Sequence, residues 1–322
     1  MFSRPIHKMN ICVVEHQHKA QPYINALLSS HHHIKRRTVN AECLLIDHEW
    51  AGLFAGLPKV TWRKQILEAE QRGMPIFIYP HSVRPNIPHD LTDQYYPARA
   101  LFTIAEGHKE ILRRIGYPNP IEVMGWTYTE IEEFRQRKSS EKIRVLFAPI
   151  HPVGNGYLPD AERELNAKTY KKLLGLIDRI DLTVRHIQPL ESNGLWFDER
   201  ANIIRGAMDG STRQMSNMDV VIGAFTFAYM AVALGYPLVM MGEGIKPHNS
   251  PRGSGKLIYA RNWEKYKDYM KFPHNVEDCS SKTDLLDMLK RAMQAPPDEW
   301  KERFIGQPFD GRRFVKTLEG YL

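Results

Sequence analysis

The chain has few cysteines and no long apolar run. Its three cysteines, Cys12, Cys43 and Cys279, lack the spacing of a disulfide framework or a zinc site. Cys12 and Cys43 lie within apolar runs, which indicates buried thiols. No apolar stretch approaches the ~18 residues that a membrane span needs, and no signal peptide is recognisable. We therefore expect a globular protein of the cytoplasm.

Two kinds of metal site are also missing. No Asp-x-Asp triplet occurs, and the histidines lack the short helical spacings of zinc ligands. Without a metal, the charge of a bound phosphate has to be balanced by basic side chains or by a helix N-terminus. We expect neither a required metal nor a cofactor.

Positive charge is in modest excess. The chain carries 44 lysines and arginines against 37 acidic residues, a formal charge of +7. This balance favours acidic ligands such as nucleotides, anionic lipid surfaces or nucleic acid. The basic residues are scattered in short groups, and no zinc finger, RRM-like or basic-helix motif accompanies them.

The most informative pattern is the segment Met218–Gly244. Val220–Ile222 and Leu238–Met241 are continuous apolar runs, as strands covered on both faces of a parallel sheet require. Between them lie a loop, Gly223–Thr226, and an apolar helix that ends at a Gly-Tyr-Pro sequence. This is a βαβ unit of an α/β protein, and its loop offers backbone N–H groups to an anion.

Strands and helices alternate along both halves of the chain, which predicts doubly wound parallel sheets. The polar stretch Arg135–Lys142 separates two Rossmann-like domains, residues 1–138 and 143–322. We expect the last helix to pack back toward the first domain, and the His31–His33 run to be exposed. The other predicted strands are Asn10–Val14, Cys43–Ile46, Met74–Tyr79, Ala100–Ile104, Ile121–Met124, Ile143–Phe147, Asp181–His186 and Asn202–Ile204; the helices include Gln21–Ser29, Thr61–Arg72, Gly107–Ile115, Ala161–Asp178, one capped at Ser281, and Arg312–Leu322.

Four segments together resemble the GT-B superfamily of nucleotide-sugar enzymes, above all its CDP-glycerol glycerophosphotransferase and UDP-N-acetylglucosamine 2-epimerase branches. They are Ile76–Ser82, Ala100–Trp126, Val145–Pro149 and Met218–Met241, in the order in which these families carry them. The resemblance implies two domains that face a cleft. It places a nucleotide-diphosphate donor on the second domain and an acceptor on the first.

The sequence departs from these families in several ways. They usually carry a glutamate early in the donor-site helix, where this chain has Met230, and no carboxylate occurs between Asp219 and Glu243. Ser82 replaces the glycine that usually follows the histidine at the end of the strand. The first departure makes an altered or lost activity one of the alternatives.

The first domain offers candidates for the catalytic base and for acceptor binding. His81 directly follows an apolar strand, and imidazole titrates near neutral pH, as a base that accepts a hydroxyl proton must. Each candidate has the alternative of a local structural role. The other candidate bases are Asp47 and His16, and the candidate acceptor-binding residues are His18, His48 and Arg84.

The second domain offers candidates for holding a diphosphate. His151 and Gly154 lie in a glycine-rich loop after a strand, where the backbone can approach phosphate closely, although a simple turn explains the same residues. Arg185 and His186 end the next strand, and a guanidinium holds phosphate through two bonds. The remaining candidates are Phe225 and Thr226 at the helix N-terminus and Glu243 for donor hydroxyls.

These residues lead to one main prediction and three alternatives. The main one is a metal-independent glycosyltransferase that moves a sugar, or glycerol phosphate, from a nucleotide-diphosphate donor to a hydroxyl of a polysaccharide, a wall polymer or modified DNA. The alternatives are a phage-type DNA glycosyltransferase acting on hydroxymethylated bases, a UDP-sugar 2-epimerase-like enzyme, and a non-catalytic nucleotide-binding protein.

Overall fold

The computed structural model describes residues 8–14, 20–47, 61–80, 98–127, 141–151, 158–206, 211–242 and 258–322. The chain divides into two compact units. The first consists of residues 1–129, 249–266 and 306–322, and the second of residues 130–248 and 267–305. Helix α8 (Ile258–Met270) has residues in both units.

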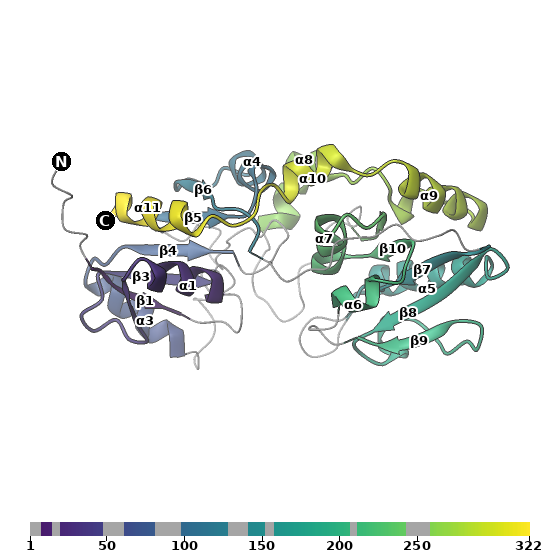
Figure 1. The fold of residues 1–322 in the computed structure, drawn as a ribbon, viewed down its shortest axis with the longest axis horizontal. Helices are drawn as coiled ribbons and strands as arrows, with labels where there is room; N and C mark the ends of the chain where they lie inside the picture. The colour runs from purple at the N-terminus through teal and green to yellow at the C-terminus, as the bar shows by residue number, and fades with distance from the viewer. Residues whose placement is uncertain are drawn as a thin grey trace. The chain divides into compact units, whose positions relative to one another are not determined.

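The first unit is built on a parallel sheet with strand order β2-β1-β3-β4-β5-β6 (Figure 1). Every residue of β3, β4 and β5 is buried, because helices cover these inner strands on both faces. The strands are β1 (Asn10–Val13), β2 (His33–Lys35), β3 (Cys43–Asp47), β4 (Ile76–Tyr79), β5 (Ala100–Thr103) and β6 (Ile121–Val123); the helices are α1 (Gln21–Ser29), α3 (Thr61–Gln71), α4 (Glu106–Arg114) and α11 (Gly311–Tyr321).

The C-terminal helix α11 belongs to the core of the first unit. It packs on α1 (Figure 1), and the Phe314 ring lies edge-on to Tyr23 and to Phe102, with ring centres 5.1 Å apart in both pairs. Asp310 caps the helix by accepting a hydrogen bond from the Arg313 N–H at 3.0 Å. The unit is therefore assembled from segments at both ends of the sequence.

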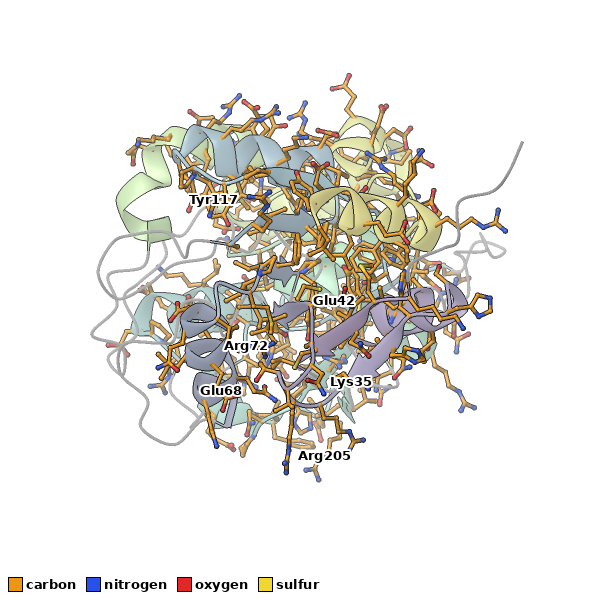
Figure 2. The ribbon with its side chains drawn as sticks, turned by 90° about the vertical axis from the view of Figure 1, so that its left-hand side faces the viewer. Lys35, Glu42, Glu68, Arg72, Tyr117 and Arg205 are labelled. Carbon is orange, nitrogen blue, oxygen red and sulfur yellow. The ribbon has the colours of Figure 1, made fainter. Side chains whose placement is uncertain are left out.

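A polar contact fastens α3 to the segment between β2 and β3. Arg72 donates to the carbonyl of Thr38 at 2.5 Å, and the Thr38 hydroxyl donates to the Glu68 carboxylate. The side chains of Glu68 and Arg72 are labelled in Figure 2. Glu42, in the same segment, accepts from the Asn10 N–H at 2.8 Å. These contacts tie the helix to the edge of the sheet where β1 and β2 begin.

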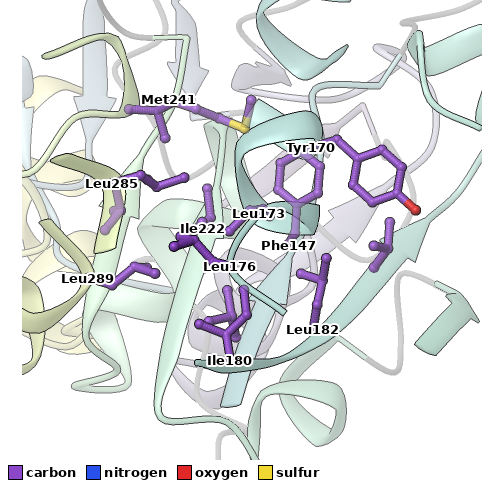
Figure 3. Close-up of a cluster of buried hydrophobic side chains, with 14 of the residues drawn as sticks. Phe147, Tyr170, Leu173, Leu176, Ile180, Leu182, Ile222, Met241, Leu285 and Leu289 are labelled. Atoms are coloured by element: carbon purple, nitrogen blue, oxygen red, sulfur yellow. The ribbon is translucent and has the colours of Figure 1, made fainter. Parts of the chain in front are cut away.

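The second unit is built on a five-stranded parallel sheet with order β11-β10-β7-β8-β9. Its core joins Phe147, which stacks on Tyr170 at 6.3 Å, to Leu285 and Leu289 (Figure 3). The strands are β7 (Ile143–Phe147), β8 (Ile180–His186), β9 (Asn202–Arg205), β10 (Val220–Gly223) and β11 (Leu238–Met240); the helices are α5 (Asp160–Leu174), η2 (Leu190–Asn193), α6 (Ser211–Met215), α7 (Phe225–Ala233), η4 (Val276–Asp278), α9 (Lys282–Gln294) and α10 (Asp298–Phe304).

The predicted α/β class with two parallel sheets is confirmed, and several boundaries are corrected. Helix α7 begins at Phe225, so Phe225 and Thr226 lie in its first turn and not in the preceding loop. Helix α5 ends at Leu174 and not at Asp178, because Gly175 occupies its C-cap. The capping box at Ser281 is present as expected.

The prediction for the histidine run was wrong for its middle member. His32 is 2% exposed, and His33 begins the short strand β2. The His32 ring accepts from the Met9 N–H at 3.2 Å and lies 3.2 Å from the Glu319 carboxylate on α11. Because Glu319 is so distant in the sequence, the polar run His31–His33 gives no sign that His32 is buried.

Candidate functional site

The first turn of α7 follows directly on β10. Ala224, the N-cap residue, has an extended backbone (φ −127°, ψ 160°) and no side-chain cap. The first N–H groups of a helix have no acceptor within the helix, and here they are carried by Phe225, Thr226 and Phe227. Such a terminus favours an anion through these donors and through the helix dipole.

Arg185 lies at the same edge of the sheet, on strand β8, which is separated from β10 by β7. It lies near the end of β8 and is 5% exposed. Its guanidinium carbon lies 4.7 Å from the centre of the Phe227 ring, in the first turn of α7. Burial lowers the pKa of Arg185 below its ordinary value, although a guanidinium stays protonated in proteins. A desolvated cation thus lies beside the helix N-terminus.

Gln214 and Gly206 also contact that guanidinium. The Arg185 Nε donates to Oε1 of Gln214 on α6 at 2.7 Å. A Cβ atom on Gly206 would lie 2.6 Å from the same Nε, so the backbone at residue 206 lies against the guanidinium. Helix α6 packs beside α7 (Figure 1).

The two histidine candidates of the second unit lie on adjacent strand ends. His186 ends β8 and is half-buried, and its Nδ1 lies 3.0 Å from the carbonyl of Gln188, which indicates that Nδ1 carries a proton. His151 is half-buried and follows β7 after a short segment. Because β10, β7 and β8 are neighbours and parallel, their carboxyl ends line one edge.

A buried asparagine holds the backbone next to His151. Asn166 of α5 accepts from the Ile150 N–H at 2.9 Å and donates to the Ile150 carbonyl at 2.7 Å. It also donates to the Asn193 carbonyl at 2.8 Å, in the segment after β8. One side chain therefore fixes both segments that leave the sheet at this edge.

The end of β11 completes the same edge. The Gly242 N–H donates to Glu277 at 2.7 Å, and its φ of 83° is one that glycine adopts readily. A Cβ on Gly242 would lie 2.8 Å from the Ile150 side chain. Its neighbour Glu243 and the loop residue Gly154 lie outside the described residues.

In the first unit the structure describes one of the candidates. Asp47 ends β3, is fully buried, and pairs in register with Tyr79 at the end of β4. The Tyr79 hydroxyl donates to the Val14 carbonyl at 2.8 Å, so the ends of β1, β3 and β4 lie together. The candidates outside the described residues are His16, His18, His48, His81 and Arg84.

The structure thus brings together His151, Arg185, His186, Phe225 and Thr226 at one sheet edge. Gln214, Gly206 and Asn166 were not among the residues predicted from the sequence. Of these, only Asn166 left a signal, since it falls on the apolar side of its helix with Leu173. Within the described ranges no three His, Cys, Asp or Glu side chains group as metal ligands, and no helix there is long and apolar enough to cross a membrane.

No family model matches the sequence, and no curated protein matches it. Solved structures match the fold over almost the whole chain. The glycotransferase of kitacinnamycin superposes with a TM-score of 0.54 at 8% identity, covering 98% of this chain and 99% of that one. The spinosyn rhamnosyltransferase SpnG with spinosyn aglycone superposes with a TM-score of 0.52 at 11% identity, covering 97% of this chain and 100% of that one. SnogD from Streptomyces nogalater superposes with a TM-score of 0.51 at 9% identity, covering 98% of this chain and 99% of that one. At these identities the likeness establishes the fold, which is that of the GT-B glycosyltransferases.

Proposed function

We propose that the protein is a glycosyltransferase that uses a nucleotide-diphosphate donor, and that its second unit binds the diphosphate. The observation that carries the proposal is the buried Arg185 guanidinium, 4.7 Å from the Phe227 ring in the first turn of α7. A guanidinium and a set of backbone N–H groups are complementary to two linked phosphates. The GT-B fold supports the assignment, because its members named above are glycosyltransferases.

The same groups would assist the chemical step. When the acceptor oxygen bonds to the transferred sugar carbon, the bond from that carbon to the diphosphate breaks and negative charge grows on the leaving oxygen. Fixed donors that already point at this charge stabilise it without reorganisation. We assign this role to Arg185 and to the N–H groups of Phe225 and Thr226, with His151 and His186 as further contacts to the donor.

The first unit would supply the base. The acceptor hydroxyl must lose a proton as its oxygen attacks, and His81 remains our first candidate to take it. Asp47, at the end of β3, is an alternative base or a group that orients one. We propose that His16, His18, His48 and Arg84 contact the acceptor or contribute to this proton transfer.

The donor's nucleotide and its transferred group belong to the proposal as well. One of the similar structures is described as SpnG complexed with thymidine diphosphate, and another as its complex with spinosyn aglycone. For this chain we propose a nucleoside diphosphate sugar, with CDP-glycerol as the alternative implied by the sequence resemblance. We propose that no metal is required.

Thermal-shift screening tests the proposal. UDP, CDP, GDP and dTDP, with their sugar or glycerol conjugates, are added to the full chain, since a ligand that binds only the folded state raises Tm. We expect one nucleotide to raise Tm, and Arg185→Ala to reduce the shift. No shift from any of them in a well-folded protein would overturn the proposal.

A non-catalytic nucleotide-binding protein is the second candidate, and one observation favours it. Helix α7 contains no carboxylate, and the half-buried Met230 stands where the resembling families carry a glutamate. Nucleotide binding without donor hydrolysis or transfer would select this candidate. The same absence disfavours the 2-epimerase, which needs acid–base carboxylates at the sugar.

A transfer assay can distinguish DNA from carbohydrate as the acceptor. Arg99, Arg113 and Arg114 are exposed on the first unit, although Arg114 pairs with Glu110 at 2.9 Å. Transfer to hydroxymethylated duplex DNA, compared with unmodified DNA of the same sequence, tests the phage-type alternative. Transfer to a carbohydrate hydroxyl alone would reject it.

A further inference from the structure

The guanidinium of Arg185 is contacted on three sides by groups from different segments. The Phe227 ring of α7 lies 4.7 Å from its central carbon. The backbone at Gly206, which follows β9, leaves no room for a Cβ atom beside it. The third contact is the 2.7 Å hydrogen bond from Nε to Gln214 Oε1. A long side chain with many rotamers is thereby held in one arrangement.

Gln214 is itself fixed at both ends of its amide. Its oxygen accepts from Arg185, and its nitrogen donates to the Arg205 carbonyl at 3.2 Å. The two partners differ in chemistry, since one is a donor and the other an acceptor, so the orientation of the amide follows from the network. Gln214 therefore links the end of β9 to the arginine near the end of β8.

The contact at Nε determines how the rest of the guanidinium can be used. An arginine binds phosphate most strongly when two parallel N–H groups meet two oxygens, which demands a defined plane and direction. Ordering a mobile arginine only when the ligand arrives costs side-chain entropy. A guanidinium that is already oriented avoids most of that cost.

We infer that Gln214 is a positioning residue that, together with Gly206, orients Arg185 for binding a diphosphate. The inference rests on the proposed function, because it assigns the ligand of Arg185 to the donor diphosphate. Through Arg185, Gln214 affects the binding of the phosphate part of the ligand and not that of the nucleoside. Removing the Gln214 side chain then weakens the binding of a nucleoside diphosphate and leaves the binding of the bare nucleoside unchanged.

Isothermal titration of the full chain tests this with four proteins and three ligands. The proteins are the wild type, Gln214→Ala, Arg185→Ala and the double variant. The ligands are the nucleoside diphosphate selected by the thermal-shift screen, its nucleoside, and pyrophosphate. We expect Gln214→Ala to weaken the binding of the nucleoside diphosphate about tenfold, as the loss of a hydrogen bond to a charged group does. In the Arg185→Ala background, Gln214→Ala should not weaken the binding of the diphosphate any further.

Asn217→Ala is the matched control, since it removes an exposed amide just beyond α6. It should bind every ligand as the wild type does. Equal weakening of diphosphate and nucleoside by Gln214→Ala would show a general structural role and overturn the inference. Equal losses from Gln214→Ala with and without Arg185 would also overturn it.

Gln214→Glu tests the inference if the alanine variant does not fold. A carboxylate still accepts from Nε, although it cannot donate to the Arg205 carbonyl, and its charge opposes an anion beside Arg185. We expect a folded protein with clearly weaker diphosphate binding, whereas unchanged binding would contradict the inference. If the wild type binds neither the diphosphate nor pyrophosphate, the proposed function and this inference fall together. If it binds them and Gln214→Ala binds them equally well, only the inference falls.

Discussion

The guanidinium of Arg185 lies over the ring of Phe227, with 4.7 Å between the guanidinium carbon and the ring centre. This contact joins the end of β8 to the first turn of α7. The Arg185 cation therefore lies beside the N-terminus of the helix that follows β10. A cation over an aromatic face is attracted to it, and the attraction is stronger when both are shielded from water. The pairing places positive charge where the helix dipole already favours an anion.

A methyl group at residue 206 should weaken ligand binding. In Gly206→Ala the new Cβ would lie 2.6 Å from the Arg185 Nε and 2.7 Å from its guanidinium carbon, so the side chain must move. We expect about tenfold weaker binding of the nucleoside diphosphate, measured by titration calorimetry, with a folded protein by circular dichroism. Gly320→Ala is the control, because no described atom outside its own stretch of helix lies within 4 Å of the added Cβ there. Wild-type affinity in Gly206→Ala would contradict the placement of Arg185.

Removing the Asn166 side chain should destabilise the second unit. Asn166→Ala leaves the N–H and carbonyl of Ile150 and the carbonyl of Asn193 without this partner in a buried region. We expect the free energy of unfolding to fall by roughly 3 kcal/mol in a urea titration. Lys168→Ala, on the exposed side of the same helix, should leave Tm nearly unchanged, since its ion pair with Glu164 is open to solvent. A loss no larger than that of the control would show that Asn166 does not hold these segments.

The last helix should be essential to the first unit. Phe314→Ala removes a fully buried ring that contacts Tyr23 and Phe102. The cost for such a truncation is roughly 3–5 kcal/mol, which urea unfolding followed by circular dichroism measures. Arg312→Ala, at an exposed position of α11, is the matched control. A small effect of Phe314→Ala would mean that α11 is not part of this core.

The buried thiols predict how stability depends on alkaline pH. Burial, with a smaller contribution from Glu68, raises the pKa of Cys12 from 9.0 to about 11, and burial with Glu42 raises the pKa of Cys43 to about 12. The unfolded chain releases these protons at lower pH than the folded chain does. Their contribution to stability is therefore complete below about pH 8.5 and is lost as pH rises toward 11 and 12.

Two measurements check this dependence. The free energy of unfolding in urea should fall between pH 8 and pH 10, and it should fall less steeply in Cys43→Ala. At pH 8 Ellman's reagent should react with the thiols in urea but not in the native protein, because all three cysteines are buried. Rapid reaction of Cys12 or Cys43 in the folded protein would contradict their burial.

The sequence was sufficient to predict the parallel sheets, because most of their strands are short apolar runs between helices. It predicted the βαβ unit of β10, α7 and β11 closely, since Gly235 and Pro237 end the helix and begin the strand. It failed for β2, whose three residues, His33–Lys35, carry little apolar character and lie at the sheet edge. It also placed the start of α7 too late, because Ala224 gives no capping signal.

Positions in the candidate site were predictable only where the residues lie at or just beyond the end of a strand. The position of Arg185 and His186 at the end of β8 was predicted in this way, as was that of Phe225 and Thr226 shortly after β10. Gln214 and Gly206 were not, because their importance arises from contacts with Arg185 across separate segments. The burial of His32 likewise depends on Glu319, near the other end of the chain.

A crystal structure of the full chain with the selected nucleoside diphosphate would locate the diphosphate site. We expect phosphate oxygens within hydrogen-bond distance of the Arg185 guanidinium and of the N–H groups in the first turn of α7. A diphosphate bound elsewhere on the protein, with Arg185 making no contact to it, would contradict the proposed donor site.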